Sequence, residues 1–136
     1  TLRARWVLLE SAPPARLKAA AVRGAPASGA VLACPLARQI LAGGVPAWWP
    51  AGVPLRVVVT EGEPDHLTWC ARSSDADVSA PAVIGAWSGS LTRALVDRIP
   101  DGTQVVEALH DDEAGRVYAA RLAELAGGRL QIRRAG

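Results

Sequence analysis

The sequence contains no methionine and no phenylalanine, and of its 15 basic residues one is lysine and the rest are arginine. A coding sequence rich in G and C gives this bias, so we assign it to codon usage rather than to arginine chemistry. Long apolar runs are also missing, since none approaches the roughly 20 residues that span a bilayer. The N-terminus lacks the charged start, apolar middle and small-residue cleavage site of a secretory signal. These absences predict a soluble, cytoplasmic protein.

The composition that is present is typical of one globular domain. The chain has 136 residues, of which 50% are apolar and 21% are charged, and this balance predicts a single α/β domain over residues 1–136. The net charge of +2 hides a gradient, because residues 1–50 carry six basic residues and one acid. Nucleic-acid-binding domains usually show a denser basic patch with interleaved aromatic residues. We therefore expect no nucleic-acid partner.

Alternating and periodic apolar patterns divide the chain into elements. The expected strands are 3–11, 29–34, 55–60, 66–72, 103–110 and 129–134, of which 55–60 and 66–72 form a hairpin across the turn 61–65 and 29–34 lies buried in the sheet centre. The expected helices are 13–23, 35–43, 81–99 and 112–126. The fold class that follows is α+β, with a mostly antiparallel or mixed sheet of about six strands and helices packed chiefly on one face.

Several short motifs follow one another in the middle of the chain. They are an apolar strand ending in Cys34-Pro35, a short helix, a strand that opens Val53-Pro54-Leu55, and an acidic turn that begins at Glu61. In this order they resemble the core of a bacterial family known as domain of unknown function 302, over about residues 6–99. The resemblance implies a compact fold like that of the TATA-binding protein, and it implies no known activity.

Two features depart from that family pattern. Cys34 stands where the family has asparagine, and the strand-helix-strand unit that opens the family pattern sits at the C-terminus here, over residues 103–134. The order therefore looks permuted, and an exchange of strands between two copies of the chain would also fit.

Cys34 is the residue with the clearest chemical potential, because it immediately precedes the helix that Pro35 opens. Free backbone donors and the positive end of the helix dipole favour an anion there, so Cys34 is a candidate catalytic thiolate, with Arg38 one turn along as an anion partner. Two alternatives stay open. Cys34 can be a small apolar residue that ends a buried strand, or it can form a disulfide with Cys70.

The potential metal ligands are scattered. Besides the two cysteines, the soft ligands are His66 and His110, and no Cys-x-x-Cys or His-x-x-x-His spacing groups them. His110 precedes Asp111 at an expected helix start, where a solvated turn or a general base are the two interpretations. We expect neither a metal nor a cofactor.

Trp48 and Trp49 lie in a proline-rich loop that precedes the strand at Leu55. Together with Arg38 and Leu55 they are candidates for a small-molecule pocket, and the tryptophans could equally close the core or form an oligomer contact. The function expected from these features is a non-enzymatic small-molecule binding or accessory protein that forms a homodimer, with no membrane partner. The alternative is a thiol-dependent enzyme or redox protein that uses Cys34.

Overall fold

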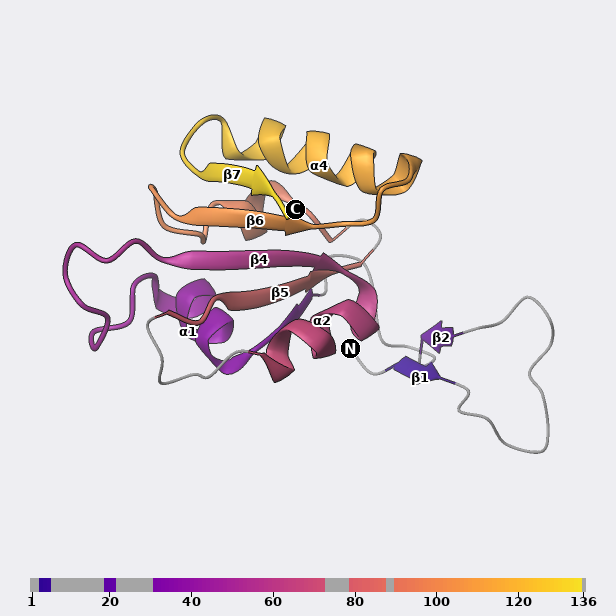
Figure 1. Ribbon diagram of the computed structural model, residues 1–136, viewed down its shortest axis with the longest axis horizontal. Coiled ribbons are helices and arrows are strands. Elements are labelled where there is room, and N and C mark those ends of the chain that lie inside the picture. Colours follow the sequence, from indigo (N-terminus) through magenta and orange to yellow (C-terminus); the bar gives the residue numbers. More distant parts are fainter. Residues whose placement is uncertain (1–2, 6–18, 22–30, 73–78, 88–89, 136) are drawn as a thin grey trace.

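The computed structural model describes residues 3–5, 19–21, 31–72, 79–87 and 90–135. They form an α+β domain in which a five-stranded mixed sheet carries four helices (Figure 1). The strands of the sheet are β3 (Val31–Ala33), β4 (Arg56–Glu61), β5 (Ala82–Ala86), β6 (Gln104–Ala108) and β7 (Gln131–Arg134). A separate antiparallel pair joins β1 (Arg3–Arg5) to β2 (Ala19–Ala21).

The strand order of the sheet is β3-β5-β4-β6-β7. β5, β4, β6 and β7 run parallel to one another, whereas β3 is antiparallel to β5 and occupies an edge. Parallel neighbours require crossover connections, and helices supply them. The helices are α1 (Pro35–Gly43), α2 (Gly62–Ala71), α3 (Arg93–Val96) and α4 (Glu113–Ala126).

Three helices share one face of the sheet, as expected, and α2 lies on the other. Arg93 on α3 donates a hydrogen bond to the Leu125 carbonyl of α4, and Arg98 just beyond α3 donates to the Leu41 carbonyl of α1. On the opposite face, His66 of α2 packs directly against Gly85 of β5. The main core is enclosed on the side of α1, α3 and α4, and its central members are Ile40, Val57, Val59, Ile84, Val105 and Leu122.

The expected hairpin over 55–72 is wrong in its second half, because residues 62–71 form α2. The apparent turn is a helix start. Gly62 has a φ of +74° and redirects the chain after β4, and Pro64 with two acids occupies the first helical turn. Proline and acidic residues both favour the N-terminus of a helix.

The expected helix over 81–99 is also wrong, since residues 82–86 form the fully buried strand β5 and α3 covers only 93–96. The segment AVIGA is apolar on both faces because α2 covers one side and the main core the other, so its apolar spacing matches a helix by coincidence. Residues 29–34 do contain a strand, but β3 is half-buried at an edge rather than central.

The remaining predicted helices and strands are partly confirmed, partly wrong and partly outside the described residues. The helix at 35–43 and the strand-helix-strand unit within 103–134 are confirmed. The helix expected over 13–23 is wrong at 19–21, which form β2, and the rest of it lies outside the described residues, as does most of the strand expected over 3–11. Across the described part of the chain, no helix combines the length and apolar character needed to cross a bilayer.

Candidate functional site

The topology singles out one end of the sheet. β4 and β6 are neighbours in the sheet. From β4 the chain passes through α2 to β5, which flanks β4 on the side away from β6. From β6 it passes through α4 to β7, which flanks β6 on the side away from β4. In open parallel sheets, ligands bind outside the carboxyl ends of the strands at the point where such crossovers diverge. The carboxyl ends of β4 and β6 therefore define the candidate site.

Three titratable side chains meet at this point. Glu61 ends β4, Asp65 lies in the first turn of α2, and His110 follows β6. His110 Nε2 lies 2.9 Å from Asp65 Oδ2, and His110 Nδ1 lies 3.8 Å from Glu61 Oε2. The imidazole thus stands between two carboxylates that come from a different part of the chain.

Glu61 carries the most informative atom of the site. Its Oε2 is buried and accepts no hydrogen bond, since 3.8 Å from the imidazole exceeds hydrogen-bond distance. A buried carboxylate oxygen without a donor is costly. An oxygen of this kind at the carboxyl end of a central strand is suited to bind a cation.

The loop between β6 and α4 supplies further carboxylates in a fixed arrangement. Asp112 caps α4 by accepting a hydrogen bond from the Gly115 amide at 2.8 Å. Asp111 is exposed, and its Oδ1 accepts a hydrogen bond from Arg134 of β7 at 3.0 Å. Arg134 also donates to the His110 carbonyl at 3.4 Å, so β7 holds this loop against the site.

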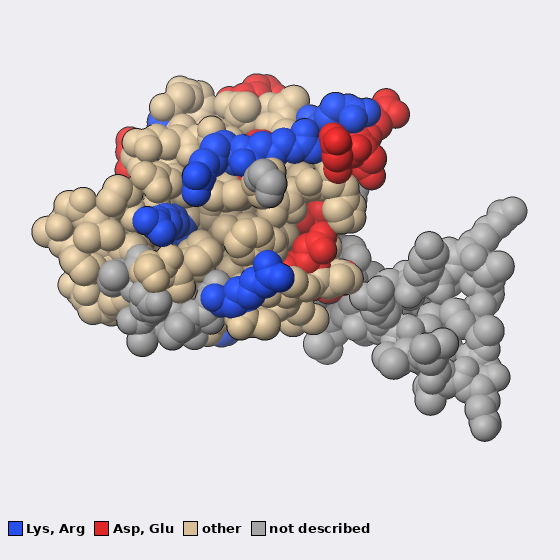
Figure 2. Space-filling model, in the orientation of Figure 1, with Lys and Arg blue, Asp and Glu red and all other residues tan. Residues whose placement is uncertain are grey.

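Acidic side chains gather at the end of the molecule toward which the arrows of β4 and β6 point (Figures 1 and 2). Glu107 lies beneath this end, buried on β6, and its register partner on β7 is Arg134. Burial raises the pKa of Glu107, and the nearby Arg134 guanidinium partly counters that effect. Arg134 therefore links a buried acid to the exposed loop.

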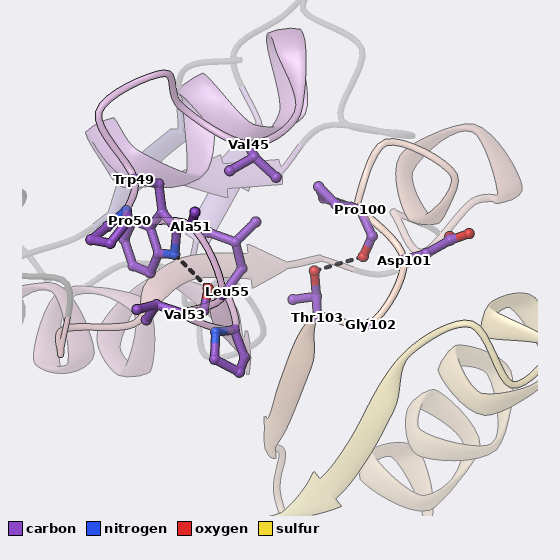
Figure 3. A pocket seen from close by; sticks show the side chains of 12 residues that line it. Val45, Trp49, Pro50, Ala51, Val53, Leu55, Pro100, Asp101, Gly102 and Thr103 are labelled. Atoms are coloured by element: carbon purple, nitrogen blue, oxygen red, sulfur yellow. Dashed lines mark hydrogen bonds between the residues drawn. The ribbon is translucent and has the colours of Figure 1, made fainter.

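The tryptophan loop lies at the opposite, amino end of the strands. Trp49 and Leu55 line a cavity of about 250 Å³ there, together with residues of the turn 100–103 that precedes β6 (Figure 3). Trp48 packs against Trp49 with ring centroids 5.5 Å apart and donates a hydrogen bond to Gln39. Arg38 is exposed on α1 and is not part of this cavity lining.

Cys34 lies in the core at the N-cap of α1. The residue is 6% exposed, and its sulfur accepts hydrogen bonds from the Ala37 amide at 3.4 Å and the Val83 amide at 3.2 Å. It is not disulfide-bonded to Cys70. These contacts fix the β3–α1 corner to β5, and catalysis by Cys34 stays a prediction.

No closed metal cage occurs within the described residues, where no three His, Cys, Asp or Glu side chains are grouped to hold an ion. No family model, curated protein or solved structure matches this chain. The resemblance to the domain of unknown function 302 therefore stays a prediction. The candidate site rests on geometry.

The sequence pattern predicts no role for Glu61 and Asp65, because it places both in a hairpin turn. A signal for them was present. An apolar run, RVVVTE, is followed at once by glycine and acids, a pattern that also fits a buried parallel strand running into a helix. His110 and Asp111 were singled out, but their partners became apparent only from the fold.

Proposed function

We propose that this domain binds a phosphate-bearing ligand through a divalent cation at the carboxyl ends of β4 and β6, and that it catalyses transfer or hydrolysis of the phosphoryl group. The observation that carries the proposal is the buried, unpartnered Oε2 of Glu61 at the point where the crossovers diverge. This proposal makes the small-molecule ligand expected from the sequence more specific and moves its site to the other end of the sheet.

Mg²⁺ is the cation that suits this arrangement. It usually keeps several waters and binds through one or two carboxylates together with substrate phosphates. Glu61 at the end of β4 and Asp111 in the loop that follows β6 are the carboxylates we assign to this role. A site completed by the ligand's own oxygens needs no closed cage of three protein side chains.

His110 and Arg134 have complementary roles in the proposed reaction. Asp65 holds one ring nitrogen of His110 at 2.9 Å and so orients the imidazole, which can then pass a proton to or from a reacting oxygen. Arg134 stands at the same loop, where a guanidinium can stabilise charge on phosphate oxygens. His110 follows β6 and Arg134 lies on β7, so these roles depend on the pairing of β6 with β7.

The test measures Mn²⁺ binding by water-proton relaxation, in the absence and presence of inorganic pyrophosphate, and then follows phosphate release with Mg²⁺. We expect Glu61→Gln to weaken metal binding at least about tenfold, since a carboxylate ligand is lost. The matched control is Glu124→Gln, which removes an exposed carboxylate paired with Arg121 on α4. Equal metal binding by wild type and Glu61→Gln would refute the site, and binding without phosphate release would limit the function to binding.

The non-enzymatic binding function expected from the sequence is a second candidate, and the cavity beside Trp49 favours it. Trp49 Nε1 donates to the Val53 carbonyl and Thr103 Oγ1 donates to the Pro100 carbonyl, so both polar groups are already engaged (Figure 3). Asp101 also lines the cavity and accepts a hydrogen bond from Arg129. The remaining lining is largely apolar, which suits a small apolar ligand.

Native mass spectrometry of protein taken directly from its expression host tests this second candidate. Ala51→Leu fills the cavity from an exposed lining position, whereas Ala47→Leu enlarges a side chain of the same loop outside the lining. We expect bound ligand to be lost in Ala51→Leu and kept in Ala47→Leu. Protein that carries no added mass would contradict this function.

A further inference from the structure

A second pair of reactive side chains lies on α2, the helix that also carries Asp65. Cys70 and His66 are one helical turn apart, and Cys70 Sγ lies 3.4 Å from His66 Nε2. Residues four apart on a helix share a face, and this face packs against β5. The spacing places a nucleophile next to a base, which is the arrangement that activates thiols in proteins.

The surroundings hold the imidazole in place. His66 is 6% exposed, and its Nδ1 is buried without a hydrogen-bond partner. Its ring lies over Gly85, where even a methyl group would come within 3.0 Å of His66 Cβ. The absence of a side chain at Gly85 therefore makes room for the imidazole, whose Nε2 faces the thiol.

The protonation state of His66 suits a base. Burial lowers the pKa of His66 below its ordinary value of 6.5, so the neutral imidazole, in which one ring nitrogen can accept a proton, is favoured. Cys70 is half-buried at the end of α2, whereas Cys34 is enclosed in the core. An oxidant in solution therefore meets Cys70 more readily than Cys34.

We infer that Cys70 is a site of reversible thiolation, in which His66 acts as the base for thiol–disulfide exchange with a low-molecular-weight disulfide. The Cys70 proton passes to His66 Nε2 as Sγ attacks one sulfur of the disulfide. The new Sγ–S bond forms as the old S–S bond breaks, and the departing thiolate takes the proton back from His66. Cys70 is oxidised and the departing thiol is reduced, so the step balances.

The experiment incubates the full chain with oxidised glutathione near neutral pH and follows each cysteine by peptide mass spectrometry. We expect Cys70 in the native protein to form the mixed disulfide at least about tenfold faster than Cys34, and faster than Cys70 in the urea-unfolded chain, because general-base catalysis typically contributes about 10²–10⁴-fold. Dithiothreitol should reverse the modification.

The variant His66→Gln keeps a polar side chain but removes the base, and we expect it to slow thiolation of Cys70 about tenfold or more. Leu67→Ala is the matched control, because Leu67 is 66% exposed on the same helix. Thiolation of His66→Gln at the wild-type rate would overturn the inference. If that variant does not fold, a native Cys70 that reacts no faster than the unfolded one would overturn it equally.

This inference is independent of the phosphoryl chemistry proposed above. Thiolation can succeed in a protein that binds no cation, and Glu61→Gln leaves both His66 and Cys70 in place. A negative result in the metal-binding experiment therefore leaves the thiolation inference standing, and the reverse also holds.

Discussion

At the residue scale, Gly115 allows the start of α4 to lie very close to the backbone of His110. It is the third residue of α4, and a Cβ there would lie 1.9 Å from the His110 carbonyl oxygen. The backbone of the β6–α4 loop can approach the helix this closely because glycine has no side chain.

Gly115→Ala should consequently lower the free energy of unfolding by about 1–3 kcal/mol, the range typical of overpacking in a well-packed region. Urea unfolding followed by circular dichroism measures the change. Gly43→Ala is the control, because no atom lies within 4 Å of its added methyl group. Equal stabilities of the two variants would contradict the close approach.

His66 makes stability depend on pH. Burial lowers the pKa of His66 in the folded state, so the unfolded chain binds a proton first as the pH falls below about 6.5. The contribution of His66 to stability is therefore complete above this pH and is lost as the pH falls toward the lowered pKa.

We expect wild type to lose more stability than His66→Gln between about pH 8 and about pH 5.5, on either side of the ordinary histidine pKa of about 6.5. Urea unfolding at both pH values gives the two differences. Parallel losses in the two proteins would show that His66 does not titrate differently on folding.

At the element scale, Arg129 ties α3 to the start of β7. Its guanidinium donates to the Val96 and Ile99 carbonyls and contacts the carboxylates of Asp97 and Asp101. The last carbonyls of a helix have no partner within it, so an arginine that reaches them stabilises the end of the short α3.

Arg129→Met should lower the free energy of unfolding by about 1–2 kcal/mol, because the Val96 and Ile99 carbonyls lose a charged donor. Within the described residues only the Val96 carbonyl keeps a second donor, the Ile99 amide at 3.0 Å. The control is Arg121→Met, which breaks an exposed pair with Glu124 and should cost less than about 1 kcal/mol. Denaturant unfolding of both variants measures the two losses of stability. An equal loss would show that Arg129 contributes no more than an exposed ion pair.

The elements that sequence reasoning predicted are those with strong local signals. α1 has a proline at its start, and α4 has an aspartate cap with glycine after its end. The predictions for α2 and β5 are wrong because the conformation of both segments depends on contacts with distant parts of the chain. α2 has little amphipathic pattern, and β5 is apolar throughout because both of its faces are covered. The partner of each strand, and hence the site between β4 and β6, could not be deduced from local patterns.

At the scale of the whole molecule, exposed apolar side chains gather at the amino end of the sheet. Val45, Trp48 and Val53 are 53%, 46% and 38% exposed, and they lie in or beside the loop that borders the Trp49 cavity. Patches of this kind are typical of contact surfaces. This patch is where we expect the homodimer predicted from the sequence to form.

Trp48→Arg should weaken such a dimer by about 2 kcal/mol or more, which is about thirtyfold in Kd. Sedimentation velocity over a wide range of concentration measures it. Leu67→Arg alters an exposed apolar residue elsewhere and should leave the dimer intact. Wild-type protein that sediments as a monomer at every concentration would exclude the dimer.

The central place of β4 has a consequence for how the protein is made. Both of its sheet neighbours, β5 and β6, follow it in the chain, so a ribosome delivers β4 before either partner exists. Until then the run of three valines at 57–59 has two open edges, and such segments are prone to associate with other chains. Each pairing must also wait for a helical crossover to close, which slows folding. Yield on refolding should therefore fall as the protein concentration rises, and slow translation through the segment after β4 should favour aggregation.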